Sequence, residues 1–137
     1  MEHQIIEKDI HVFYVQADSF PEGTLAAFEK LHLHFPFSSE RRFFGLSRPE
    51  NGQGIVYKAA AEMTSPDEAQ KCKLETMVIP RGNYIVKTVY NFMDNILLIG
   101  KAFDELLTHP SLDPQGYCVE WYLPNDKDVL CMVRLKE

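Results

Sequence analysis

The C-terminal stretch 117-YCVEWYLPNDKDVLCMVRLKE-137 decides how the rest of the chain is interpreted. Residues 117–123 and 128–136 are rich in aromatic, β-branched and aliphatic side chains, which is typical of β-strands. Asn125, Asp126 and Lys127 lie between the two runs and supply a turn. The stretch therefore predicts a β-hairpin at the end of the chain.

Glu120 is the one residue that looks misplaced in the first strand of this hairpin. Successive side chains of a strand point to opposite faces, so Glu120 shares its face with Cys118 and Tyr122, whereas Trp121 points the other way. A strand glutamate usually faces water or pairs with an arginine. Here its same-face neighbours and the apolar final strand favour a hairpin that is covered on both sides, and hence a buried carboxylate.

Burying an unpaired carboxylate costs several kcal/mol, so the fold should supply compensation. A ligand cation surrounded by aromatic rings can do this, with each ring contributing about 0.5–2 kcal/mol when water is excluded. An aromatic pocket with one acid at its base is a suitable receptor for lipophilic cations.

The first half of the chain predicts a strand, a helix and a hairpin. The strand is 10-IHVFYVQ-16, and the helix lies within residues 19–35. Ser19 and Glu22 have the spacing of a capping box, and Pro21 suits the first helical turn. Leu25, Phe28, Leu31 and His32 then recur at helical spacing. Residues 41–49 and 52–63 follow as two strands joined around residues 49–54.

The second half repeats this order after a polar connection, residues 64–73, which carries one helical turn begun by Ser65 and Glu68. Residues 74–80 and 83–90 are expected strands on either side of Arg81-Gly82. Asn91 is the expected cap of the next helix, which ends at His109-Pro110. Its apolar stripe is formed by Phe92, Ile96, Ile99, Phe103 and Leu106.

The two halves can be aligned as repeated βαββ units, over about residues 8–63 and 73–137. In this alignment Gly45 corresponds to Glu120. We therefore expect a single domain over residues 1–137 of the α+β class. It should have an antiparallel sheet, two main helices and a central ligand groove near the pseudo-twofold axis, since ligands often bind at internal interfaces.

Composition and charge exclude several classes of protein. The chain is 45% hydrophobic and 12% aromatic, as expected for an ordered domain, and 14 basic against 20 acidic residues give a net charge of −6. This balance argues against binding to a nucleic-acid backbone. No apolar run approaches the roughly 18 residues of a membrane span. There is no secretory signal pattern, so we expect a cytoplasmic protein.

Metal, cofactor and covalent sites have little support in the sequence. The three cysteines, Cys72, Cys118 and Cys131, do not have the spacing of metal ligands. Cys118 and Cys131 lie in apolar strand patterns, where we expect reduced, buried thiols. His32 and His34 are two residues apart, so a helix points them in different directions. No serine or cysteine has a recognisable base partner. We expect no metal and no cofactor.

Two stretches resemble the GyrI-like domain, also called the bacterial transcription-activator effector-binding domain. These are 78-VIPRGNYIV-86 and 119-VEWYLPNDKDVLCMVRLK-136. With the repeated units and the chain length, the resemblance extends over nearly the whole sequence. It implies a sheet with two helices and a central pocket for small, often cationic or amphipathic molecules, of the kind that serves multidrug binding.

By position, the resemblance implies that Glu120 is the pocket acid and that Tyr84 and Tyr122 are its aromatic neighbours. Trp121 is adjacent in sequence, although alternation places it on the opposite face. The hairpin of the first half supplies two further wall candidates. The expected ligand-binding residues are therefore Glu120, Tyr84, Tyr122, Tyr57, Trp121 and Phe44.

Well-known members of the family are fused to a helix-turn-helix domain that this sequence lacks, so we expect a stand-alone form that does not itself bind DNA. The first hypothesis is a small-molecule binding protein with a regulatory or sequestering role. The alternatives are a hydrolase of a reactive small molecule, with Glu120 as general base, and a protein-partner inhibitor or modulator. A homodimer also stays open.

Overall fold

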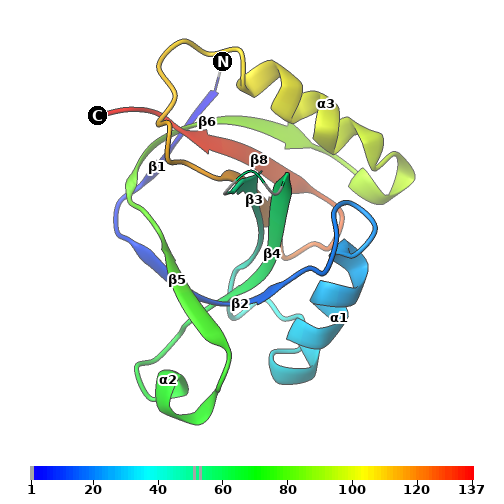
Figure 1. Cartoon of the computed structure of the whole chain (residues 1–137), viewed down its shortest axis with the longest axis vertical. Helices are drawn as coiled ribbons and strands as arrows, with labels where there is room; N and C mark the ends of the chain where they lie inside the picture. Colours follow the sequence, from blue (N-terminus) through cyan, green and yellow to red (C-terminus); the bar gives the residue numbers. More distant parts are fainter. Residues whose placement is uncertain (1, 51, 53) are drawn as a thin grey trace.

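All eight strands belong to one antiparallel sheet, which curls so that its inner face turns toward itself (Figure 1). The computed structural model describes residues 2–50, 52 and 54–137. The strands are β1 (Glu2–Ile6), β2 (Ile10–Gln16), β3 (Phe43–Pro49), β4 (Ile55–Glu62), β5 (Glu75–Ile79), β6 (Gly82–Val89), β7 (Cys118–Tyr122) and β8 (Val129–Arg134).

The strands are hydrogen-bonded in the order β1-β6-β8-β7-β3-β4-β2-β5. β7 and β3 are therefore the central pair, and each is followed on its outer side by its own hairpin partner, β8 or β4. In the central pair Gly45 lies directly opposite Glu120. The two positions that the internal alignment relates are thus cross-strand neighbours.

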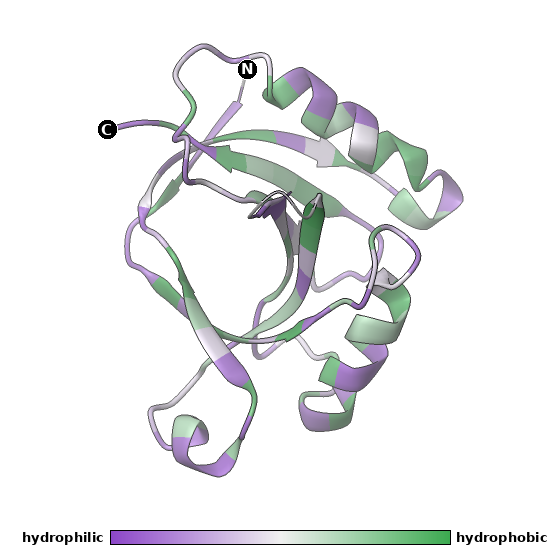
Figure 2. Ribbon diagram, viewed as in Figure 1, coloured by the Kyte–Doolittle hydropathy of each residue, from purple (hydrophilic) through white to green (hydrophobic). Residues whose placement is uncertain are grey.

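Two helices cover the outer face of the curled sheet. α1 (Thr24–His34) packs on β4 and β2, and α3 (Leu97–Leu106) packs on β6 and β8. α2 (Glu68–Lys71) is a single turn between β4 and β5, and the 3₁₀ helix η1 (Phe92–Asp94) precedes α3. Figure 2 shows hydrophobic and hydrophilic stretches alternating along α1 and α3, as expected for helices with one buried side.

The core consists of one inner and two outer clusters. The inner cluster is built from strand residues such as Val12, Phe44 and Tyr84. One outer cluster lies under α3 around Leu106, and the other lies under α1 around Leu31. Because strand side chains alternate between these layers, each central strand contributes to the inner core and to a helix interface.

The expected α+β fold, with an antiparallel sheet and two main helices, is confirmed. The β2 strand, the β3–β4 and β7–β8 hairpins and the single helical turn between the halves occur where the sequence predicts them. The strands on either side of Arg81-Gly82 also form. They pair with different partners, because β5 bonds to β2 and β6 bonds to β1 and β8. The duplication of a βαββ unit stays a prediction.

The helix starts were predicted wrongly. α1 begins at Thr24, after Gly23, and no side chain caps it. The expected capping box does not form, because the Gly23 amide donates to the Ser19 carbonyl at 3.1 Å and makes a separate turn. Leu25, which was expected in the buried stripe, is 69% exposed, because the buried side of α1 is formed by Ala27 and Leu31.

The second main helix also begins later than the sequence predicts. Asn91 precedes η1 in the left-handed backbone region, and α3 begins only at Leu97, after Ile96. Ile96 is therefore exposed, whereas Phe103 and Leu106 are buried as predicted. β1 was not predicted, because its five residues carry mostly exposed side chains and lack clear alternation. No helix in the described part of the chain is long and apolar enough to span a membrane.

Candidate functional site

Glu120 lies at the centre of β7, on the outer face of the sheet and between the positions of the two helices. Glu120 is buried, with only 7% of its surface exposed. The Tyr57 hydroxyl donates a hydrogen bond to Glu120 Oε1 at 3.0 Å, and the Tyr122 hydroxyl donates a short one to the same oxygen. One carboxylate oxygen thus receives two tyrosine hydroxyls, one from β7 itself and one from β4 on the far side of β3.

The second carboxylate oxygen, Oε2, receives no hydrogen bond from a described residue. Within the described part of the chain no side-chain oxygen or nitrogen is both fully buried and without a partner. Oε2 therefore keeps a small contact with the exterior. The carboxylate is held through Oε1, and Oε2 is the oxygen that has no hydrogen-bond donor among the described residues.

Gly45 makes this arrangement possible. It faces Glu120 across the β3–β7 pair. A Cβ atom at this position would lie 2.1 Å from the Tyr57 hydroxyl oxygen and 2.9 Å from Glu120 Oε1. Only glycine leaves room for the tyrosine to cross β3 and reach the carboxylate.

Three phenylalanine rings pack on the two tyrosines that bond Glu120, and we call these five rings the aromatic cluster. Phe28 of α1 contacts both tyrosines, with ring centroids 6.2 Å from Tyr57 and 5.4 Å from Tyr122. Phe20 stacks on Tyr57 at 5.6 Å, and Phe92 of η1 contacts Tyr122 at 5.3 Å. The cluster combines α1, η1, two strands and the segment before α1, and its outermost ring, Phe20, is 41% exposed.

Burial dominates the electrostatics of the site. Loss of hydration raises the pKa of Glu120, and the hydrogen bonds from Tyr122 and Tyr57 oppose this rise only in part. Burial also raises the pKa of both tyrosines well above the usual range, and the nearby carboxylate adds to the effect. The hydroxyls therefore stay protonated and act as donors.

The two neighbouring thiols share this environment. Cys131 lies opposite Glu120 on β8, and Cys118 precedes it by two residues on the same face. Burial raises the pKa of Cys118 to about 11 and that of Cys131 to about 12, with a further contribution from Glu120. Neither thiol is a thiolate near neutral pH, so both act here as small apolar groups.

The structure brings together three of the six expected site residues, Glu120, Tyr122 and Tyr57. The others lie on the inner face. Tyr84 is 1% exposed and donates its hydroxyl to the Pro80 carbonyl at 2.6 Å. Phe44 and Trp121 pack on each other with centroids 5.9 Å apart, in the inner core. The alternation of side chains along the strand already predicted that Trp121 points away from Glu120, toward the inner face.

No protein-family model matches this sequence, and no curated protein matches it either. Two solved structures share the fold. The integron cassette protein VCH_CASS2, from the mobile metagenome of Vibrio cholerae, has a TM-score of 0.67 at 14% identity, over 98% of this chain and 95% of that one. SAV2435, solved bound to tetraphenylphosphonium, has a TM-score of 0.63 at 12% identity, over 99% of this chain and 94% of that one. At these identities the likeness establishes the fold alone.

Sequence reasoning missed Phe20, Phe28 and Phe92 as members of the site. Phe28 and Phe92 were expected in the helix cores, where spacing alone places them. Phe20 precedes α1 in a turn that the sequence suggested as helix. No local pattern reveals that these rings converge on one carboxylate, since their contacts join elements far apart in the chain.

Such an arrangement suits recognition of a positive charge. A cation close to Oε2 would gain a partially desolvated carboxylate and nearby ring faces, while the tyrosine hydroxyls keep the carboxylate in place.

Proposed function

We propose that this protein binds a small lipophilic or amphipathic cation at Glu120, and that it does so in a regulatory or sequestering role. The observation that carries the proposal is the buried carboxylate, which is fixed through Oε1, has no donor to Oε2 among the described residues, and is bonded by two tyrosines that belong to the aromatic cluster. The burial of an acid without a basic partner is costly unless a function compensates for it.

The same proposal includes membership of the GyrI-like family. Two features support it: the sequence resemblance of residues 78–86 and 119–136, and a fold shared with a protein that was solved with a lipophilic cation. The expected central groove corresponds, in this proposal, to the space between α1 and α3 that the aromatic cluster fills. A ligand would then have to displace Phe20, the most exposed of the rings.

A titration with tetraphenylphosphonium tests the proposal, with tetraphenylborate as a ligand of similar shape and opposite charge. We expect micromolar binding of the cation, at least about tenfold weaker binding by Glu120→Gln, and no comparable binding of the anion. Glu105→Gln removes one negative charge from the exposed side of α3 and should leave binding unchanged. Because burial raises the pKa of Glu120, affinity should increase with pH as the carboxyl loses its proton.

Equal affinity of wild type and Glu120→Gln for the cation, or equal affinity for both ligands, would contradict a site at this carboxylate. Absence of binding to the folded wild type would contradict cation recognition altogether. In that case a protein partner should be sought by co-purification, with Glu120→Gln as the comparison.

Hydrolysis is the second candidate, and one observation favours it. A carboxyl with a raised pKa and an oxygen free of protein donors can accept a proton from an attacking water. Turnover of an electrophilic ligand by wild type, lost in Glu120→Gln with ligand affinity retained, would favour the enzyme over the receptor.

A further inference from the structure

A second concavity, which we call the inner pocket, lies on the opposite face of the sheet from Glu120. It has a volume of about 180 Å³. Its apolar floor includes Leu46 of β3 and Val119 of β7, which pair with each other across the central strands. Val119 immediately precedes Glu120 in β7. Because successive side chains of a strand point to opposite faces of the sheet, Val119 lies in the inner pocket and Glu120 lies on the outer face.

The charged side chains that line the inner pocket, among the described residues, are both basic. Arg48 and Arg134 line it, whereas no described aspartate or glutamate does. The molecule as a whole has a net charge of −6, so a pocket whose charged lining is basic differs from the overall charge of the chain. This sign is opposite to that of the Glu120 site.

Arg48 is held in place by three contacts. Its Nε donates to Glu50 at 3.2 Å, its Nη1 donates to the Gln115 carbonyl at 2.6 Å, and its guanidinium lies 4.1 Å from the ring centre of Tyr117. No described residue accepts a hydrogen bond from Nη2. One nitrogen of a fixed guanidinium therefore remains available for an acceptor.

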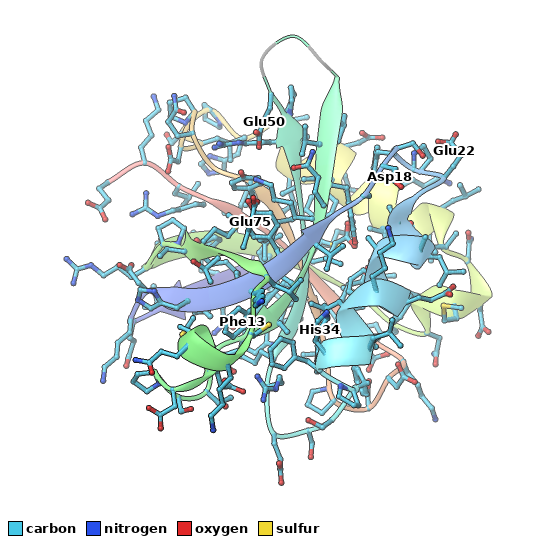
Figure 3. All side chains as sticks on the ribbon, turned by 60° about the horizontal axis from the view of Figure 1, so that its bottom comes forward. Phe13, Asp18, Glu22, His34, Glu50 and Glu75 are labelled. Carbon is cyan, nitrogen blue, oxygen red and sulfur yellow. The ribbon has the colours of Figure 1, made fainter. Side chains whose placement is uncertain are left out.

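Tyr117, which forms one wall, is fixed in turn. Lys58 is 8% exposed and donates to the Tyr117 hydroxyl at 3.0 Å, and that hydroxyl donates to Glu50 at 2.9 Å. Figure 3 shows Glu50 and Glu75 on the same side of the molecule, where Glu75 accepts the hydroxyl of Tyr14 at 2.6 Å. These contacts order the wall before any ligand arrives, which lowers the entropic cost of binding.

Arg134 is also ordered. Its side chain is 14% exposed, its Nε donates to the Arg81 carbonyl at 2.9 Å, and its Nη1 bonds Asp113 at 3.0 Å. Its Nη2 contacts Glu137, whose side chain is 76% exposed. A ligand acceptor can use the second hydrogen of either terminal nitrogen, since each carries two.

We propose that the inner pocket binds a small monocarboxylate with an apolar body, such as a single aromatic ring or a branched aliphatic chain. The volume is below the roughly 300–1,000 Å³ of pockets for drug-sized ligands, which limits the body to that size. The planar fork of a guanidinium matches a carboxylate, and the apolar floor takes the remainder. Because both arginines already bond acidic partners, the pocket suits a ligand with one negative charge rather than several.

Benzoate is the probe, and benzamide is its neutral counterpart of the same shape. Binding is followed by amide chemical shifts of the full chain, with Gly116 and Val119 as reporters of the inner pocket. We expect benzoate to shift these amides, and Arg48→Gln to weaken its binding at least about tenfold. Met77→Trp, which fills the pocket from β5, should do the same if Arg48→Gln fails to fold.

Two comparisons complete the design. Benzamide should bind at least about tenfold more weakly than benzoate, and Glu120→Gln should bind benzoate as wild type does, since Glu120 lies on the other face. No shift of the reporter amides by benzoate up to about 10 mM would overturn the proposal. Equal affinity for benzamide, or undiminished binding by folded Arg48→Gln and Met77→Trp, would overturn it as well.

Discussion

Glu120 loses its hydration on folding and receives two tyrosine hydroxyls at one oxygen in exchange. Burial nevertheless dominates, and the pKa of the carboxyl is raised above its ordinary value of 4.5. A group whose pKa is higher in the folded than in the unfolded state stabilises the fold below the unfolded pKa, and this contribution is lost as pH rises through the folded pKa. The ionised carboxylate that the proposed function needs is therefore the form that destabilises the protein.

We accordingly expect Glu120→Gln to stabilise the folded state at neutral pH, by about 1–2 kcal/mol, because the amide keeps acceptor capacity without a buried charge. For a chain of this size that corresponds to an increase in Tm of roughly 3–8 °C. The difference between wild type and variant should shrink as the pH is lowered toward 4.5, where the wild-type carboxyl is protonated in the folded state. Thermal unfolding of both proteins from pH 4 to 8 measures this, and a difference that does not change with pH would contradict it.

Gly45 gives a second prediction at this scale. In Gly45→Ala the new methyl group would lie 2.1 Å from the Tyr57 hydroxyl oxygen, so the tyrosine must leave the carboxylate. We expect a loss of about 1–3 kcal/mol in the free energy of unfolding, as for other overpacked cores, together with weaker cation binding.

Gly100→Ala is the matched control for this change. Nothing lies within 4 Å of a Cβ at Gly100, which is inside α3. The same substitution should there stabilise the protein by about 0.5–1 kcal/mol, because alanine favours the helix. Chemical denaturation of the two variants should give shifts of opposite sign; a shift of the same sign in both would refute the steric explanation at Gly45.

At the scale of elements, each long helix covers one part of the outer face, and the rings of the site come from α1 and from η1, the short helix before α3. α1 inserts Leu31 into a core with Phe13 and Phe43, and it places Phe28 over the two tyrosines. η1 leads into α3 and places Phe92 against Tyr122. The position of the aromatic cluster therefore depends on the packing of both helices against the sheet.

Leu31 and Leu33 test this packing, since both lie on α1 and differ only in environment. Leu31 is fully buried, whereas Leu33 is 85% exposed. We expect Leu31→Ala to lower the free energy of unfolding by about 2–5 kcal/mol and Leu33→Ala to change it by less than about 0.5 kcal/mol. Urea denaturation distinguishes them, and similar costs for the two variants would mean that α1 packs with a different face.

At the scale of the whole molecule, the curled sheet separates two environments that differ in charge. The outer face holds an acid among aromatic rings, and the inner face holds a pocket lined by two arginines. The central strands β3 and β7 contribute to both, because alternate side chains point to opposite faces. Glu120 and Val119 are neighbours in sequence and belong to different sites for this reason alone.

Sequence patterns alone predicted every described strand except β1, both hairpins, the α+β class and the face that Glu120 shares with Tyr122. These properties are local, since strand periodicity and turn residues act over a few positions. Only the tertiary structure decided that Tyr57, 63 residues from Glu120, reaches the carboxylate past Gly45, and that Tyr84 points to the inner core. Strand order and helix docking set those contacts, and they depend on packing between residues far apart in the chain, which no local pattern encodes.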